Sequence, residues 1–205
     1  MTPAKRTLDI LLALALMALM ALPFGLLLVW LLVQERLPLF YVSERVGALG
    51  QPFALWKLRT MTVAPPEQGV SGGDKQARIT KTGAFLRRVR LDEVPQVWNI
   101  LKGDMSFVGP RPPLRLYVER FPDLYGQVLR NRPGVTGLAT LVFHRHEERL
   151  LARCRTPQET DAVYSRRCVP RKARIDLIYQ RRRTILMDLW LMAKTLQHAM
   201  NSSNR

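Results

Sequence analysis

Two adjacent carboxylates, Asp92 and Glu93, are the residues whose types most directly suggest chemistry in this sequence. They follow an arginine-rich segment at positions 87–90 and precede Pro95. Because proline is best tolerated in the first turn of a helix, we predict that a helix begins near Asp92. The positive end of that helix and the neighbouring arginines both favour ionised carboxylates. The pair can therefore supply a nucleophile or a metal ligand, although a simple helix cap by Asp92 explains the pattern as well.

A second candidate is Arg111, which stands between Pro110 and Pro112. The fixed φ angles of the two prolines leave the backbone around this arginine little freedom. A guanidinium on a rigid loop suits bidentate binding of a phosphate group. The alternative interpretation is a proline-rich connector whose arginine is incidental.

The elements that position these residues are predicted to be mostly helices with a few short strands. Strand-like patterns occur at residues 39–42, 53–58 and 135–143. Apolar residues recur at helical spacing in residues 85–89, 91–101, 114–125 and 175–200. The second of these helices has an apolar stripe that includes Trp98, and Gly103 is its stop signal. A loop rich in proline and glycine at 63–74 is either a mobile lid or a surface excursion.

An uncharged apolar run from Ile10 to Val33 precedes this domain. As a helix it would be roughly 36 Å long, which is enough to cross a hydrocarbon core of about 30 Å. Lys5 and Arg6 precede the run, as they would in a cleaved signal peptide. The run is longer than a signal core and is not followed by a small-residue cleavage site. We therefore expect a retained membrane segment.

Pro23 lies near the centre of the apolar run, where it removes the hydrogen bond to the carbonyl of Leu19 and bends the helix. Basic residues flank both ends, so the positive-inside rule gives a spanning helix no clear orientation. A re-entrant helix that bends at Pro23 would place both basic ends in the cytoplasm. A proline-kinked spanning helix is the alternative. We expect residues 1–36 to form the re-entrant helix and residues 37–205 to form a cytosolic α/β domain with interfacial helices.

The chain is strongly basic, with 32 Lys and Arg against 16 Asp and Glu and a net charge of +16. Such a surface attracts nucleic acid, phospholipid head groups or phosphorylated substrates.

Cys154 and Cys168 are too few for a disulfide framework and too far apart for a zinc site, so both are expected to be reduced thiols. His144 and His146 would share a face of the predicted strand, but a metal there is not favoured.

Taken together and in this order, these features resemble the bacterial sugar transferase family, the small monotopic polyprenyl-phosphate phosphoglycosyl transferases. The block from residue 78 to 112 is the most specific part of the resemblance, which covers nearly the whole chain. The matching segments are Lys5, Arg6 and Asp9, 57–61 (KLRTM), 78–83 (RITKTG), 91–96 (LDEVPQ), Asn99 with 101–106, 108–112 (VGPRP) and 132–137 (RPGVTG).

The resemblance implies that Asp92 attacks the β-phosphate of a UDP-sugar, forming an aspartyl-phosphosugar intermediate and releasing UMP. Polyprenyl (undecaprenyl) phosphate would then take the phosphosugar, in the first membrane step of glycoconjugate synthesis. Mg²⁺ would be held by Asp92 with support from Glu93. The residues expected to bind substrate phosphates are Lys57, Arg59, Lys81, Arg88 and Arg111.

The resemblance also places the enzyme at the bacterial inner membrane, with Pro23 as the break of the re-entrant helix and the active site on the cytoplasmic face. Anionic membrane lipids are expected partners, nucleic acid is not, and a homodimer is left open. Two positions depart from the family pattern: Leu22 replaces a serine, and Arg90 replaces a small or hydroxylic residue.

Two other functions would explain part of the pattern. A membrane-tethered basic module that binds nucleic acid or anionic lipid would explain the net charge, but it would not explain the Asp-Glu pair or the rigid loop around Arg111. A hydrolase with the same carboxylates would release free sugar phosphate without a lipid acceptor.

Overall fold

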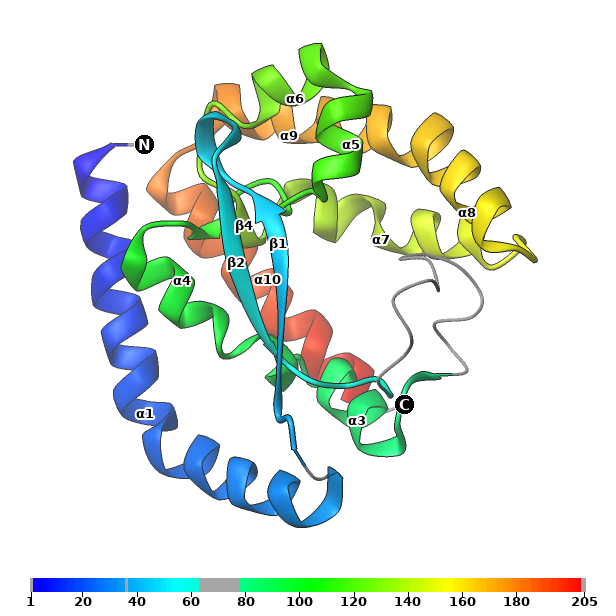
Figure 1. The fold of residues 1–205 in the computed structure, drawn as a ribbon. Helices are drawn as coiled ribbons and strands as arrows, with labels where there is room; N and C mark the ends of the chain where they lie inside the picture. Colours follow the sequence, from blue (N-terminus) through cyan, green and yellow to red (C-terminus); the bar gives the residue numbers. More distant parts are fainter. Residues whose placement is uncertain (1, 36, 63–77, 204–205) are drawn as a thin grey trace.

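The apolar N-terminal run forms one long helix, α1 (Pro3–Glu35), in the computed structural model of the chain. The structure describes residues 2–35, 37–62 and 78–203. Within this part of the chain, α1 is the one helix long and apolar enough to cross a membrane by length and composition. It changes direction along its length, so that its second half runs beneath the rest of the molecule (Figure 1). Pro23 lies inside the helix and removes a backbone hydrogen bond there.

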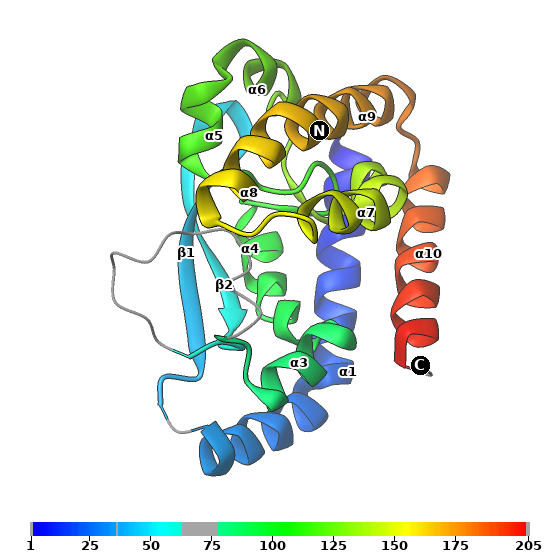
Figure 2. The same cartoon turned by 90° about the vertical axis from the view of Figure 1, so that its right-hand side faces the viewer.

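The remainder of the described chain is mostly helical, as the sequence predicts, with two small two-stranded sheets. The hairpin strands are β1 (Phe40–Val46) and β2 (Pro52–Leu58), joined by η1 (Ala48–Gly50). The second sheet pairs β3 (Ser106–Val108) with β4 (Gly134–Thr136). The helices are α3 (Lys81–Arg88), η2 (Leu91–Glu93), α4 (Gln96–Lys102), α5 (Arg115–Arg120), α6 (Pro122–Val128), α7 (Leu138–Leu151), α8 (Pro157–Val163), η3 (Tyr164–Cys168), α9 (Val169–Arg182) and α10 (Ile185–Ser203). The hairpin lies at one edge of the domain and α10 at the opposite edge (Figure 2).

Both ends of α1 are fastened to this domain. Near its start, the Lys5 ammonium pairs with the Asp188 carboxylate of α10 at 2.5 Å, and both residues are buried. The Arg6 guanidinium donates hydrogen bonds to the last carbonyls of α4, at 2.6 and 2.7 Å. At the other end, Arg59 donates to the carbonyl of Glu35 at 2.7 Å. The middle of α1, by contrast, leaves most of its apolar side chains exposed.

The hairpin is antiparallel, and its register pairs Tyr41 with Lys57 and Arg45 with Phe53. Because side chains alternate between the two faces of a strand, Arg45, Leu55 and Lys57 share one face. This face looks toward η2 and α4, where the carboxylate pair lies.

The short parallel pair β3 and β4 fixes the loop that carries Arg111. Gly109 donates a backbone hydrogen bond to the Thr136 carbonyl at 2.9 Å, and Gly134 donates to the Pro110 carbonyl at 2.8 Å. The strands approach so closely that a Cβ atom on Gly134 would lie 2.1 Å from the Gly109 nitrogen. Glycine is therefore required where these two backbones meet.

The structure confirms the hairpin, α3 and the end of α4 at Gly103, whose φ angle is 95°. The carboxylates do not begin a regular helix: they lie in the 3₁₀ turn η2, and α4 starts only at Gln96. The helix predicted over 114–125 is two helices, α5 and α6, because Pro122 starts the second. The predicted loop at 63–74 lies outside the described residues.

The strand predicted over 135–143 is wrong beyond Thr136. Residues 138–151 form α7 instead, and its buried residues Ala139 and Phe143 have the four-residue spacing of a helix face. His144 and His146 consequently belong to a helix rather than a strand. The apolar stripe predicted for α4 is also partly wrong, because Trp98 is 56% exposed while Val97 and Ile100 are buried.

Candidate active site

The turn that carries the carboxylates is held in an unusual backbone conformation. Arg90, immediately before η2, has φ 59° and ψ 21°, in the left-handed region that residues with a Cβ atom rarely adopt. The turn lies between α3 and α4 and against β2. Asp92 and Glu93 are each only 8% exposed.

Glu93 is surrounded by cations from three separate segments. Its Oε1 accepts from Lys57 Nζ at 3.0 Å and from Arg111 Nη2 at 2.9 Å, while its Oε2 accepts from Arg90 Nη2 at 2.6 Å. Burial by itself would raise the pKa of Glu93, but the charges of Arg111, Lys57 and Arg90 outweigh it and hold this pKa well below its usual range. Glu93 is therefore ionised and serves to gather the basic side chains.

Asp92 has a different environment. Its carboxylate accepts no hydrogen bond from any residue that the structure describes. Burial, followed by the negative charge of Glu93, raises the pKa of Asp92, and the charges of Lys57, Arg87 and Arg90 oppose this rise. A buried carboxylate with such free oxygens has the character of a nucleophile or a metal ligand rather than that of a structural ion-pair partner.

A small polar cavity of about 20 Å³, which has room for about one water molecule, lies beside Glu93 and is lined by side chains that include Arg45, Lys57, Gln96 and Arg111. Burial, followed by the positive charge of Arg111, lowers the pKa of Arg45 and likewise that of Lys57. The Arg45 Nε atom is buried and has no hydrogen-bond partner among the described residues. Three cations therefore line one cavity, and an oxygen atom of an anion such as a phosphate group would satisfy them.

Of the five residues predicted to bind phosphate, Lys57 and Arg111 lie at this site. The Arg88 guanidinium lies 6.0 Å over the Phe85 ring on the exposed side of α3. Arg59 holds the end of α1, and Lys81 is exposed at the start of α3.

Sequence reasoning missed Arg45 and Gln96 as site residues. Arg45 could have been found from the register of the hairpin. The turn length fixes which residues of the two strands are paired, and paired residues lie on the same face of the hairpin. The turn in η1 was not predicted in enough detail to use it.

The described residues contain no group of three or more His, Cys, Asp or Glu side chains that could hold a metal by themselves. Of the two adjacent carboxylates, it is Asp92 whose oxygens are free of hydrogen bonds from the described residues. The three cations on Glu93 occupy its oxygens, so Asp92 is the better placed of the two carboxylates for a metal, and metal binding by the pair stays a prediction. Mg²⁺ commonly binds through one or two carboxylates together with substrate phosphates, and this arrangement suits that mode.

Comparison with known proteins gives a consistent family match. A family model described as bacterial sugar transferase matches residues 1–202. The uncharacterized sugar transferase EpsL of Bacillus subtilis (strain 168) is 41% identical over 104 residues, which cover 51% of this chain and 51% of that protein.

Two further relatives have names that state a reaction. The UDP-glucose:undecaprenyl-phosphate glucose-1-phosphate transferase of Klebsiella pneumoniae is 40% identical over 133 residues, covering 63% of this chain and 29% of that protein. The UDP-N-acetylgalactosamine-undecaprenyl-phosphate N-acetylgalactosaminephosphotransferase of Aeromonas hydrophila is 36% identical over 111 residues, covering 51% of this chain and 26% of that protein. The chain thus matches about half of the length of EpsL and less than a third of the length of the other two relatives.

Proposed function

Because the chain belongs to the bacterial sugar transferase family, we propose that it moves a sugar 1-phosphate from a UDP-sugar to a polyprenyl phosphate such as undecaprenyl phosphate. The observation that carries the proposal is the contrast between the two carboxylates: Glu93 is neutralised by three cations, whereas Asp92 is buried with free oxygens. The donor and acceptor classes follow the names of the relatives from Klebsiella pneumoniae and Aeromonas hydrophila.

In the first step, an Asp92 carboxylate oxygen attacks the β-phosphorus of the UDP-sugar. The bond from that phosphorus to the bridging oxygen breaks, and UMP leaves with the electron pair. In the second step, a phosphate oxygen of the polyprenyl phosphate attacks the same phosphorus. The acyl phosphate bond breaks, the Asp92 carboxylate is restored, and polyprenyl-diphosphate-sugar is formed.

The cations beside Asp92 have two tasks in this scheme. Arg45, Lys57 and Arg111, which line the small polar cavity, bind oxygens of the diphosphate at its edge and neutralise the charge that would otherwise repel a carboxylate nucleophile. Glu93 keeps Lys57 and Arg111 in place, because each donates to its Oε1 atom. When bound, Mg²⁺ would contribute further neutralisation of the diphosphate, with Asp92 as its protein contact.

The proposal places the chain at the cytoplasmic face of the bacterial inner membrane with α1 as a re-entrant helix, and the contacts of α1 support the re-entrant part. Lys5 contacts α10 and Glu35 contacts Arg59, so the two ends of α1 touch the same folded domain. A helix that carried its ends to opposite sides of a bilayer could not make both contacts.

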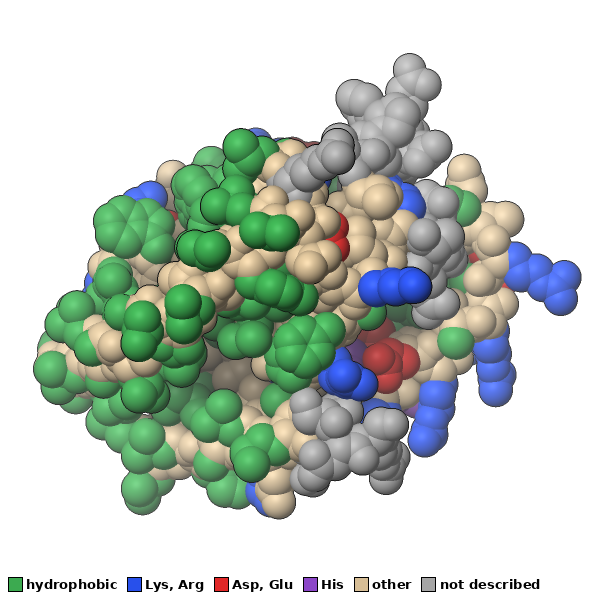
Figure 3. All heavy atoms as spheres, turned by 90° about the horizontal axis from the view of Figure 1, so that it is seen from below, with side chains coloured by type: hydrophobic (Ala, Val, Ile, Leu, Met, Phe, Trp, Pro, Cys, Tyr) green, Lys and Arg blue, Asp and Glu red, His purple; other side chains and the backbone are tan. Residues whose placement is uncertain are grey.

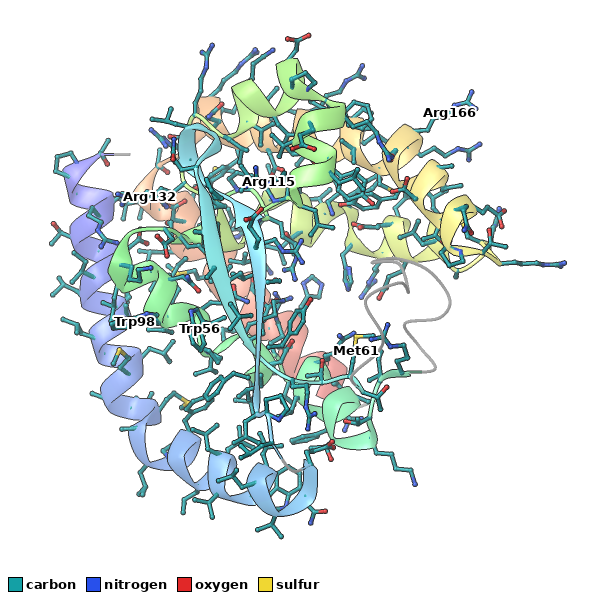
Figure 4. All side chains as sticks on the ribbon, in the orientation of Figure 1. Trp56, Met61, Trp98, Arg115, Arg132 and Arg166 are labelled. Carbon is teal, nitrogen blue, oxygen red and sulfur yellow. The ribbon has the colours of Figure 1, made fainter. Side chains whose placement is uncertain are left out.

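Aromatic side chains support the same orientation. Trp56 on β2 and Trp98 on α4 lie on the side of the domain that faces α1, whereas Arg166 extends away from the opposite side (Figure 4). Tryptophan favours the boundary between lipid and water, so this side is the one we place at the membrane surface.

The proposal is tested by trapping the intermediate. Wild-type and Asp92→Asn proteins are incubated with Mg²⁺ and a panel of UDP-sugars without lipid, then examined by intact-protein mass spectrometry. We expect a phosphosugar adduct on wild type alone, and its mass would identify the class of sugar. An Asp92→Asn protein that still transfers sugar phosphate to lipid would refute Asp92 as nucleophile. Release of free sugar phosphate in the absence of lipid would favour a hydrolase.

A further inference from the structure

An open apolar groove lies at the bend of α1. It has a volume of about 320 Å³, and its wall includes Pro23, Phe24, Leu26 and Trp30 of α1 together with Leu91. We call it the elbow groove. From below, the molecule shows a hollow surrounded by hydrophobic side chains, with acidic and basic side chains beyond one end (Figure 3).

The elbow groove is lined in part by the turn that carries the candidate active site. Leu91 contributes to its wall, and the next residue in the chain is Asp92. Leu91 also packs with the cluster that contains Leu31 and Leu86, which joins α1 to the domain at this point. The wall of the groove and the buried carboxylate are therefore contributed by neighbouring residues of one turn, η2.

This pairing of an apolar groove with a cationic cavity matches an amphiphile with an anionic head. We propose that the elbow groove holds the isoprene units nearest the phosphate of the polyprenyl phosphate acceptor. The inference rests on the proposed function, since that reaction requires the acceptor phosphate to reach the phosphorus bound to Asp92. From a phosphate at that position, a tail that passed Leu91 would reach the elbow groove.

The lining residues are suited to an occupant that enters and leaves. Leu26 is 63% exposed and Trp30 is 44% exposed, so the groove is not closed by protein. Its wall is apolar along α1, and no ion pair would have to break when a hydrocarbon chain enters.

The helix offers a matched pair of variants for a test. Leu26 lines the elbow groove, whereas Leu22 is 73% exposed on the same helix and is outside the groove lining. Leu26→Ser and Leu22→Ser therefore remove the same side chain from comparably exposed positions. Both proteins are assayed for adduct formation with UDP-sugar alone and then for transfer to undecaprenyl phosphate.

We expect adduct formation to be unchanged in both variants. The KM for undecaprenyl phosphate should rise about tenfold in Leu26→Ser, in line with the loss of the leucine area that a bound prenyl chain would cover, and should not change in Leu22→Ser. With a short water-soluble prenyl phosphate, whose chain does not fill the groove, the difference in KM between the two variants should be smaller. Equal KM changes in Leu26→Ser and Leu22→Ser would overturn the proposal.

A second measurement does not depend on turnover. Wild-type protein in nanodiscs is cross-linked with a diazirine-bearing polyprenyl phosphate, and labelled peptides are mapped. The proposal predicts that residues 20–30 are labelled. It also predicts that undecaprenyl phosphate reduces this labelling, whereas excess phosphatidylglycerol does not reduce it. Equal displacement by phosphatidylglycerol would identify a general lipid cleft and reject the proposal. Failure of the proposed reaction would instead appear in the adduct assay, whatever the cross-linking result.

Discussion

Asp92 and Glu93 are adjacent and equally buried, yet Glu93 accepts hydrogen bonds from three cationic side chains while Asp92 accepts none from the described residues. Burying a carboxylate is unfavourable unless it is paired. Glu93 is paired with cationic side chains of the protein itself. Asp92 has no such partner among the described residues, as expected of a carboxylate whose partner is supplied by the bound substrate.

Replacing Asp92 should separate activity from stability. Asp92→Asn is expected to reduce transfer on the order of 10³-fold or more, because an amide cannot act as the nucleophile. The raised pKa of Asp92 means that the folded state favours the protonated group, so the ionised form destabilises the protein at neutral pH. The variant should therefore be at least as stable as wild type at pH 7. Urea unfolding in detergent would check this, and a large loss of stability would contradict the assignment.

The same shift gives transfer a pH dependence. Asp92 must be ionised to attack, and its pKa is raised by burial and by Glu93. Activity should fall as the pH drops through this raised pKa, at a higher pH than an ordinary aspartate would require. The rate of adduct formation in the absence of lipid, measured against pH, reports this step without acceptor binding. A rate that stays constant down to pH 4 would be inconsistent with the raised pKa.

Replacing Glu93 should have the opposite effect on stability. Glu93→Gln leaves Lys57, Arg90 and Arg111 without their shared counter-charge, and we expect a loss of roughly 3 kcal/mol at pH 7. Because the folded-state pKa is lowered, the stabilisation is complete above the ordinary glutamate pKa of 4.5 and is lost as the pH falls through the lowered value. The stability difference between wild type and variant should consequently shrink in acid. A difference independent of pH would show that the charge of Glu93 is not the cause.

Arg90 allows the strain of the turn to be measured. Arg90→Gly and Arg90→Ala both remove the 2.6 Å ion pair with Glu93, but only glycine adopts φ 59° without a steric penalty. The glycine variant should be more stable than the alanine variant by about 1 kcal/mol, after allowance for the greater freedom of glycine in the unfolded chain. Equal unfolding free energies would mean that the left-handed conformation is not retained.

Local signals in the sequence predicted much of the fold. The apolar run gave α1, alternating residues gave the hairpin, and Lys102-Gly103 gave the end of α4. The strand predicted over 135–143 failed because β-branched residues dominate its start, whereas burial of Ala139 and Phe143 against other elements decides for a helix.

The predicted part of the candidate site consists of residues that lie in recognisable sequence motifs. Asp92, Glu93 and Arg111 lie in conspicuous motifs, and the structure brings Lys57 to them. Arg45 could not be assigned in this way, because its approach depends on the register of the hairpin and on where the hairpin packs. Trp98 was misplaced for a similar reason: helical spacing identifies an apolar face but does not say whether protein or membrane covers it.

Asp176 on α9 should give the protein a second pH dependence. It is 8% exposed, its Oδ1 atom has no hydrogen-bond partner among the described residues, and burial raises its pKa to about 7. The folded state therefore holds a proton that the unfolded chain releases near pH 4, so stability should fall as the pH rises from about 4 to about 7. The loss in the free energy of unfolding that is due to Asp176 is up to about 4 kcal/mol. Asp176→Asn should remove it, while Asp123→Asn, at an exposed position, should leave the profile unchanged.

The buried pair of Lys5 and Asp188 should decide whether the start of α1 stays docked on the domain. Tyr179 also donates to Asp188 at 2.5 Å, so removal of Lys5 leaves a buried carboxylate with a hydroxyl but without its counter-charge. We expect Lys5→Met to cost roughly 3 kcal/mol and to increase amide hydrogen exchange in the first turns of α1. Lys5→Met combined with Asp188→Leu should recover part of that loss, because both charges are then absent. If the double variant is as unstable as the sum of its parts, the two residues are not coupled, and the docking of α1 must depend on Arg6 and on apolar packing instead.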